Sequence, residues 1–166
     1  MRFDLEKRQN LLIIILFFLL TLAFFIRLFL PSIKLIYTPD FLRSDAFHFN
    51  YSLKKNLSDS LKNNNLPLWS DKIGGGFPVL AESQIGTFNI TNLLLFKLFS
   101  PAIAFNLTIL VIFSTLLTGQ YLFLKSLNLS SYAAFLGSVC FSFSTYFLTK
   151  ITHLNHIQTA SFLPLI

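Results

Sequence analysis

The sequence predicts an all-α, polytopic transmembrane protein fragment that carries a large external loop. Apolar stretches of membrane-spanning length occur near the N-terminus and again from Ala102 onward, and 54% of the residues are hydrophobic. Between these stretches lies a mixed segment, residues 31–101, which holds five Asp or Glu residues. About twenty helical residues, each rising about 1.5 Å, cover the roughly 30 Å of a hydrocarbon core.

The first predicted span is Leu11–Leu30, an almost unbroken run of Leu, Ile and Phe that is interrupted late by Arg27. A cleaved secretory signal is the alternative, but this run exceeds the usual 7–15 apolar residues and no small-residue cleavage site follows it. Short flanking segments rich in Lys and Arg stay in the cytoplasm. Residues 1–10 are therefore expected to be cytoplasmic, since they contain Arg2, Lys7 and Arg8.

The external loop 31–101 is expected to carry two interfacial helices. Residues 45–63 are amphipathic, with Ser44 or Asp45 as the N-cap, and this helix is expected to lie in the interface plane with its apolar face toward lipid. Its apolar positions recur at three- and four-residue steps: Ala46, Phe49, Leu53, Leu57 and Leu61. Ile90–Phe99 is too short to span and is interpreted as a surface or re-entrant helix.

The remaining chain alternates between apolar and short polar segments. Residues 102–124 are the second predicted span, 125–131 a cytoplasmic loop, and 132–149 a third span rich in small residues that favour close helix packing. Residues 150–156 are an external turn, and 157–166 begin a fourth span. Ten apolar residues cannot cross a bilayer, so we expect the chain to be the front piece of a larger protein.

Composition excludes several classes of site. The net charge is +6, but the basic residues are scattered, so the sequence predicts no nucleic-acid partner. Cys140 is the single cysteine and allows no internal disulfide. His153 and His156 are three residues apart, but zinc would need further ligands, so we predict no metal site and favour interfacial hydrogen bonding.

Asp45 is the candidate catalytic residue, because it places a carboxylate just outside the first span. Such a group acts as a general base or orients a divalent ion beside a phosphate leaving group, and helix capping is the structural alternative. Asp40 follows Pro39 and is typical of a turn. Glu82 and Gln84 follow the glycine turn 74–76 and are candidates for the same cavity. Trp69 suits an interfacial aromatic anchor.

An ordered series of motifs resembles the N-terminal part of YfhO-type bacterial membrane proteins. The series comprises Ser44-Asp45, Leu66-Pro67-Leu68-Trp69, Gly75-Gly76-Phe77-Pro78-Val79-Leu80-Ala81, Gln84-Ile85-Gly86-Thr87-Phe88, Gly119-Gln120-Tyr121, His153 and Phe162-Leu163-Pro164-Leu165. That family is similar to the GT-C superfamily of multi-span glycosyltransferases, in which the first external loop carries the catalytic acid. Asp45 holds the matching position, although Asn89-Ile90 replaces the aromatic–Pro step usual in the family.

The resemblance implies a polyprenyl-phosphate-linked sugar and membrane lipids as partners, at the outer face of a bacterial cytoplasmic membrane. The candidate substrate-binding residues are Arg43, Trp69, Glu82, Gln84 and His153, and the cofactor is left open, a divalent cation included. An anionic lipid head would be attracted by basic residues of the loop, namely Arg43, Lys54, Lys55 or Lys72. The alternatives are a transporter or lipid-handling protein that uses the loop as a gate, and a non-catalytic assembly subunit.

Overall fold

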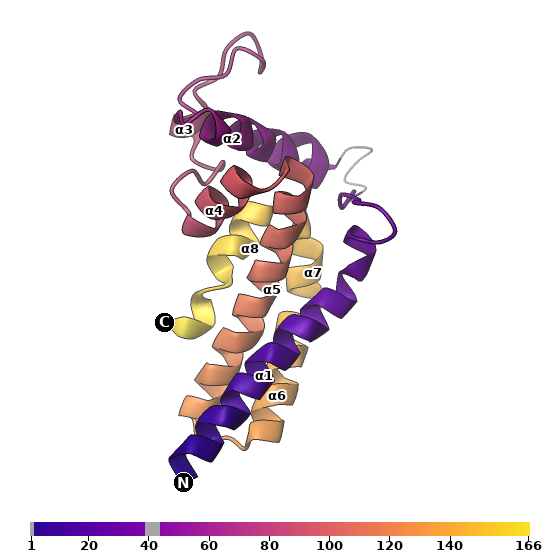
Figure 1. Ribbon diagram of the computed structural model, residues 1–166, viewed down its shortest axis with the longest axis vertical. Coiled ribbons are helices and arrows are strands. Elements are labelled where there is room, and N and C mark those ends of the chain that lie inside the picture. The colour runs from indigo at the N-terminus through magenta and orange to yellow at the C-terminus, as the bar shows by residue number, and fades with distance from the viewer. Residues whose placement is uncertain (1, 39–43) are drawn as a thin grey trace.

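The computed structural model describes residues 2–38 and 44–166, with side chains from Gln9 onward. Over these ranges the protein is all-helical, and the only extended pairing is one isolated bridge between Ser70 and Phe77. Figure 1 shows a bundle of long helices capped at one end by a layer of shorter ones. The predicted all-α class is therefore confirmed.

The centre of the bundle is α5 (Pro101–Ser126), which packs against α1, α4 and α6. It begins where Pro101 occupies the first turn, a position that tolerates the missing N–H of proline. This helix and the run Ser131–Thr152 are the two described helical segments that are long and apolar enough to cross a membrane. They cover the predicted segments 102–124 and 132–149.

The run Ser131–Thr152 is interrupted. It consists of α6 (Ser131–Ser142), α7 (Thr145–Thr149) and the 3₁₀ turn η3 (Lys150–Thr152). The interruption falls at Ser144, whose ψ of 154° is extended rather than helical. After η3 the chain turns back along α5 as α8 (Leu154–Ala160) and the short turn η4 (Leu163–Leu165).

The first helix, α1 (Arg2–Phe24), ends six residues before the predicted boundary at Leu30. Its apolar part, Gln9–Phe24, is shorter than a full bilayer crossing. A 3₁₀ turn, η1 (Ile26–Leu28), follows. The Asn106 side-chain amide of α5 donates to two backbone carbonyls here, that of Leu28 in η1 at 3.0 Å and that of Lys34 beyond it at 2.9 Å.

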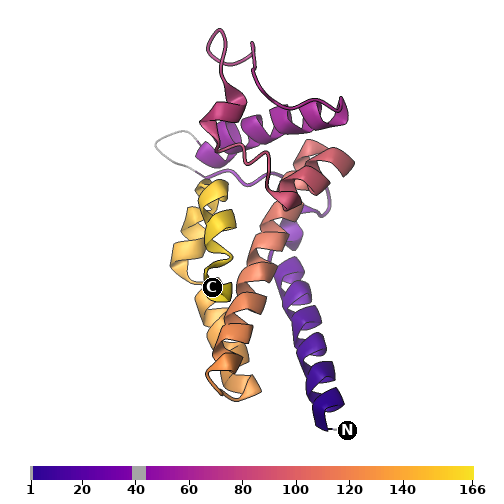
Figure 2. The same cartoon turned by 90° about the vertical axis from the view of Figure 1, so that its left-hand side faces the viewer.

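The segment between α1 and α5 forms a layer across one end of the bundle. A π-helical stretch, η2 (Ala46–Tyr51), leads into α2 (Ser52–Lys62), which lies across the end of α5 (Figures 1 and 2). The apolar side of α2 packs on α4 (Ile90–Leu98) and α5. The expectation that this side faces lipid is therefore wrong, because other parts of the protein cover it.

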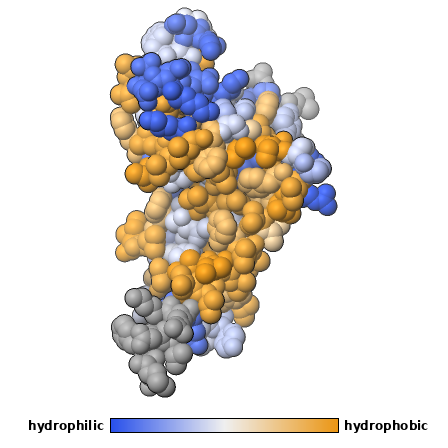
Figure 3. All heavy atoms as spheres, in the orientation of Figure 1, coloured by the Kyte–Doolittle hydropathy of each residue, from blue (hydrophilic) through white to orange (hydrophobic). Residues whose placement is uncertain are grey.

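The rest of the layer consists of turns. At Gly74, Gly75 and Gly76 φ is 58°, 80° and 135°, values that glycine adopts readily, and α3 (Val79–Glu82) follows. Figure 3 shows hydrophilic residues gathered over the layer and hydrophobic residues along the helices below it. Exposed apolar side chains line the described part of α1, among them Leu11, Leu12, Ile15, Leu16, Phe18 and Leu19. Such a surface is typical of contact with lipid.

Candidate functional site

Asp45 begins the layer at the point where the chain returns from residues 39–43. The cap of the following helix is Ser44, which is fully buried and whose Oγ accepts from the Phe47 backbone N–H at 3.3 Å. Ser44 also accepts from the backbone N–H of Thr38 at 2.9 Å. Of the two predicted caps, the structure selects Ser44, and the exposed Asp45 side chain is not the cap.

Asn50 holds the Asp45 turn against the end of the bundle. Its amide donates to the backbone carbonyl of Asp45 at 3.2 Å and to that of Thr152 at 2.9 Å. The Asn50 side chain is buried, so both bonds are shielded from water. It lies in the π-helical stretch η2, a rare conformation that occurs frequently at functional sites. Asp45 consequently lies next to the turn that leads into α8.

That turn carries the two histidines. His153 precedes α8, and its ring lies 5.5 Å from that of His156, centroid to centroid, with the planes tilted by 32°. Because Thr152 and His153 are adjacent in the chain, the bond from Asn50 brings Asp45 and His153 into one neighbourhood. These two predicted site residues are thus brought together by a contact between segments about a hundred residues apart in the sequence.

On the other side of the same turn, α8 contacts the α3–α4 connection. Gln84 donates to the Glu82 carboxylate through its backbone N–H and its side-chain amide. The Gln84 side-chain oxygen Oε1 accepts from the Asn155 side-chain Nδ2 at 3.0 Å. Glu82 and Gln84 therefore form a short hydrogen-bonded chain that ends on α8.

Deeper in this contact lies a cluster of carboxamides. Asn89 caps α4, its Oδ1 accepting from the backbone N–H groups of Thr91 and Asn92. The same oxygen accepts from Gln158 Nε2 at 3.2 Å, and Gln158 also donates to Asn92 Oδ1 at 3.1 Å. These bonds fasten α8 to the beginning of α4.

A cavity of about 610 Å³ opens beside this cluster, and we call it the amide cavity. Its polar lining includes Gln84, Asn89, Tyr146, Asn155, His156 and Gln158. Asp45, Glu82 and His153 do not line it, so the expectation that Asp45 and Glu82 face one cavity is not met here. A second cavity of about 630 Å³ lies between α1 and α6, but its wall is largely apolar and remote from Asp45.

Lys54 is buried, although it is not among the apolar positions of the predicted amphipathic helix 45–63. Its side chain is 1% exposed, and Nζ donates to the carbonyl of Ile85 at 2.8 Å and lies 5.8 Å from the centroid of the Phe96 ring. Burial lowers the pKa of Lys54 to about 7. Lys54 is therefore withdrawn from any lipid head, whereas Lys55 and Lys72 are exposed.

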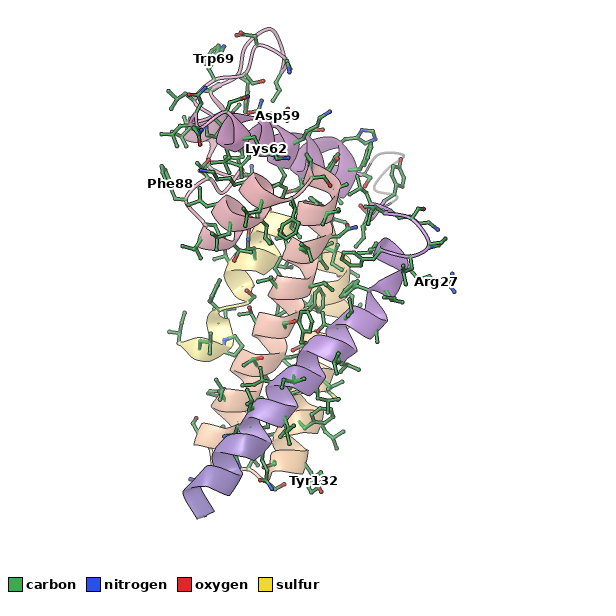
Figure 4. All side chains as sticks on the ribbon, in the orientation of Figure 1. Arg27, Asp59, Lys62, Trp69, Phe88 and Tyr132 are labelled. Carbon is green, nitrogen blue, oxygen red and sulfur yellow. The ribbon has the colours of Figure 1, made fainter. Side chains whose placement is uncertain are left out.

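The other predicted substrate-binding residues separate from this neighbourhood. Arg43 and Asp40 lie outside the described residues. Trp69 lies at the outer end of the loop layer (Figure 4), where its Nε1 donates to Asp71 at 2.8 Å. It is thus not beside the predicted membrane-spanning helices, as an interfacial anchor would be.

Within the described ranges, no three His, Cys, Asp or Glu side chains gather closely enough to hold a metal ion. The residues missed by sequence reasoning are carboxamides: Asn50, Asn89, Asn92, Asn155 and Gln158. The sequence feature that could have identified them is their position at the edges of apolar segments, because an amide that is buried there needs hydrogen-bond partners.

No protein-family model, curated protein or solved structure matches this chain.

Proposed function

We propose that this chain belongs to a GT-C-like membrane glycosyltransferase, which transfers a sugar from a polyprenyl-phosphate carrier to a cell-envelope acceptor. The reaction takes place at the outer face of the bacterial cytoplasmic membrane, with Asp45 as the base. The observation that carries the proposal is the position of Asp45 at the junction of the polar layer and the apolar bundle, held there by Asn50. At such a junction the carrier's lipid tail and charged head are accommodated together.

Comparison of the four described carboxylates in the loop supports the choice of Asp45. Asp71 lies with Trp69 at the outer end of the layer, and Glu82 is only partly exposed. Asp59 lies on the side of α2 that faces away from the bundle (Figure 4). Asp45 is exposed, and Asn50 joins its turn to Thr152 beside the α8 turn. Because every Asp and Glu of the chain precedes Ser83, the later helices supply no alternative.

The proposed step requires little covalent chemistry. The Asp45 carboxylate takes the proton of an acceptor hydroxyl, and that oxygen bonds to the anomeric carbon of the sugar. The bond from this carbon to the carrier phosphate breaks, and the carrier leaves as polyprenyl phosphate. Positioning and one base are the main demands of such a reaction. The exposed cations Lys55 and Lys72 of the layer, and Lys34 of the turn below it, supply attraction for the phosphate.

The membrane arrangement belongs to the same proposal. Three crossings are formed by α1 with η1, by α5, and by α6 through η3, and the segment from α8 onward begins a fourth. The N-terminus is cytoplasmic and the layer is external. This orientation is supported by the apolar flanks of the bundle and by the basic residues that precede Gln9.

The test is Asp45→Asn in the full-length protein, assayed for transfer of radiolabelled sugar from a polyprenyl-phosphate donor in membrane vesicles. Loss of a general base lowers the rate roughly 100- to 10,000-fold. Since Ser44 caps the helix, Asn at position 45 leaves the cap intact, so membrane level and thermal stability should be unchanged. Asp59→Asn is the matched control and should retain activity. Full transfer by the Asp45→Asn protein would remove the catalytic assignment.

A second candidate is a transporter or lipid-handling protein, favoured by the break between α6 and α7. Interrupted helices are common at the binding sites of transporters, and the buried Ser142 Oγ next to this break has no hydrogen-bond partner among the described residues. Flux of a polyprenyl-linked sugar across proteoliposomes, unchanged in Asp45→Asn and without any transfer product, would favour this candidate over the transferase.

A further inference from the structure

The wall of the amide cavity consists mainly of carboxamide, hydroxyl and apolar side chains, with one histidine, His156. Its volume of about 610 Å³ lies within the range of small-molecule sites, which is roughly 300–1,000 Å³. None of its lining residues, all within the described ranges, is Lys, Arg, Asp or Glu. The nearest buried cation, Lys54, lies behind Gly86 and donates to the Ile85 carbonyl. Recognition of an anion usually relies on cations that reach it, so this wall favours a neutral ligand.

The chemistry of the lining points to hydroxyl groups. Gln84, Asn89, Asn155 and Gln158 are carboxamides, and each offers both a donor and an acceptor. A hydroxyl group likewise donates and accepts. The exposed ring of Tyr146 adds a flat apolar surface at the same cavity. The combination matches a ring that has polar edges and an apolar face.

The carboxamides are held in position before any ligand arrives. Asn89 Oδ1 accepts from three N–H groups, and Asn155 Nδ2 donates to Gln84. These bonds fix both side chains and leave Asn89 Nδ2 and Asn155 Oδ1 without a partner in the described part of the chain. One donor and one acceptor are therefore available on a prearranged wall, which lowers the entropy cost of binding.

We propose that the amide cavity binds the uncharged, hydroxyl-rich ring of a sugar, with Asn89 Nδ2 donating to one ligand hydroxyl and Asn155 Oδ1 accepting from another. That this sugar belongs to a substrate rests on the proposed function. The cavity and Asp45 flank the same α8 turn, because His156 lines the cavity while Asn50 fastens the Asp45 turn to Thr152.

The test is saturation-transfer NMR of the full-length protein with N-acetylglucosamine, methyl glucoside, glucuronate and inorganic phosphate as probes. The protein is placed in phosphatidylcholine nanodiscs, because alkyl maltoside detergents would offer a competing sugar head. At least one neutral sugar should give a signal that neither glucuronate nor phosphate displaces. Absence of signal from both neutral sugars, or displacement by either anion, would overturn the proposal.

Two variants locate the binding. Asn155→Leu and Gln84→Leu remove carboxamides from partly or fully exposed positions and should weaken neutral-sugar binding about tenfold or more. Asn65→Leu, on the loop after α2 and away from the cavity lining, is the matched control and should bind as the natural protein does. Unchanged binding in both cavity variants refutes the site.

The failure of this inference and that of the proposed function are distinguishable. Asp45→Asn should retain sugar binding while losing transfer. If transfer persists in Asp45→Asn but binding is lost in Asn155→Leu, the sugar site stands and the base assignment fails. If transfer is lost in Asp45→Asn and binding is unaffected in the cavity variants, the base stands and the sugar site fails.

Discussion

At the scale of single residues, carboxamides make the long-range connections of this protein. Asn50 joins the Asp45 turn to Thr152, and Gln158 joins α8 to Asn92. Buried amides are stable only when they are hydrogen-bonded, so each of these side chains specifies which distant segment lies against it. The neighbourhood of the candidate site therefore depends on contacts of uncharged polar groups.

Lys54 makes the stability of the protein depend on pH. Burial lowers its pKa from 10.5 to about 7, so between these values the unfolded chain binds more protons than the folded one. Stability should therefore rise with pH from about 7 to about 10. Met is uncharged and of similar length to Lys, so Lys54→Met should abolish the increase in stability between pH 7 and pH 10 that Lys54 causes. It should also raise the melting temperature at pH 6, as measured by thermal unfolding in nanodiscs.

Lys55→Met is the control for this prediction, because Lys55 is the exposed neighbour on the same helix. Its pH profile of melting temperature should parallel that of the natural protein. If the melting temperatures of Lys54→Met and Lys55→Met change with pH at the same slope, the titration of Lys54 is not the cause of the pH dependence.

At the scale of elements, the turn that follows α1 and η1 is fastened to α5. Asn106, buried in α5, donates to the carbonyls of Leu28 and Lys34, and the Lys34 backbone N–H also donates to Leu28. The chain is thereby held in a turn below the polar layer. The path of the chain after α1 therefore depends on a contact with α5.

Asn106→Leu should release this turn. The Lys34 backbone carbonyl loses its side-chain donor. If the carbonyl stays buried, this lowers the free energy of unfolding by about 1–3 kcal/mol. The melting temperature should fall by roughly 2–4 °C for each kcal/mol in a chain of this size. Gln120→Leu, which removes a half-buried amide from the same helix, is the control and should cause a smaller loss. Equal stability of Asn106→Leu and the natural protein would contradict this account of the turn.

At the scale of the whole molecule, the polar layer and the far ends of the helices are expected to face opposite sides of the membrane. Lys72 lies in the layer, and Asn128 lies in the connection between α5 and α6 at the other end of α5 (Figure 1). An alkaline phosphatase fusion after Lys72 should be active outside the cytoplasm, and one after Asn128 should be inactive. The reverse pattern would overturn the proposed orientation.

The sequence by itself determined the local features of this protein. Apolar runs of sufficient length predicted α5 and the run Ser131–Thr152. The polar run 63–65 and the glycines 74–76 predicted a helix end and a turn, and the structure has both. These features follow from spacing and backbone preference within about ten residues, which a sequence displays directly.

Only the tertiary structure decided which distant segments meet. Helical periodicity left Lys54 outside the apolar positions, but the Ile85 carbonyl and the Phe96 ring surround its amino group. It also left Ser44 and Asp45 as alternative caps, and the structure selects Ser44. The amide cavity joins residues about seventy positions apart. The sequence shows that a buried amide needs a hydrogen-bond partner. Which residue becomes that partner depends on the packing of distant segments, and helical periodicity does not say which segments pack together.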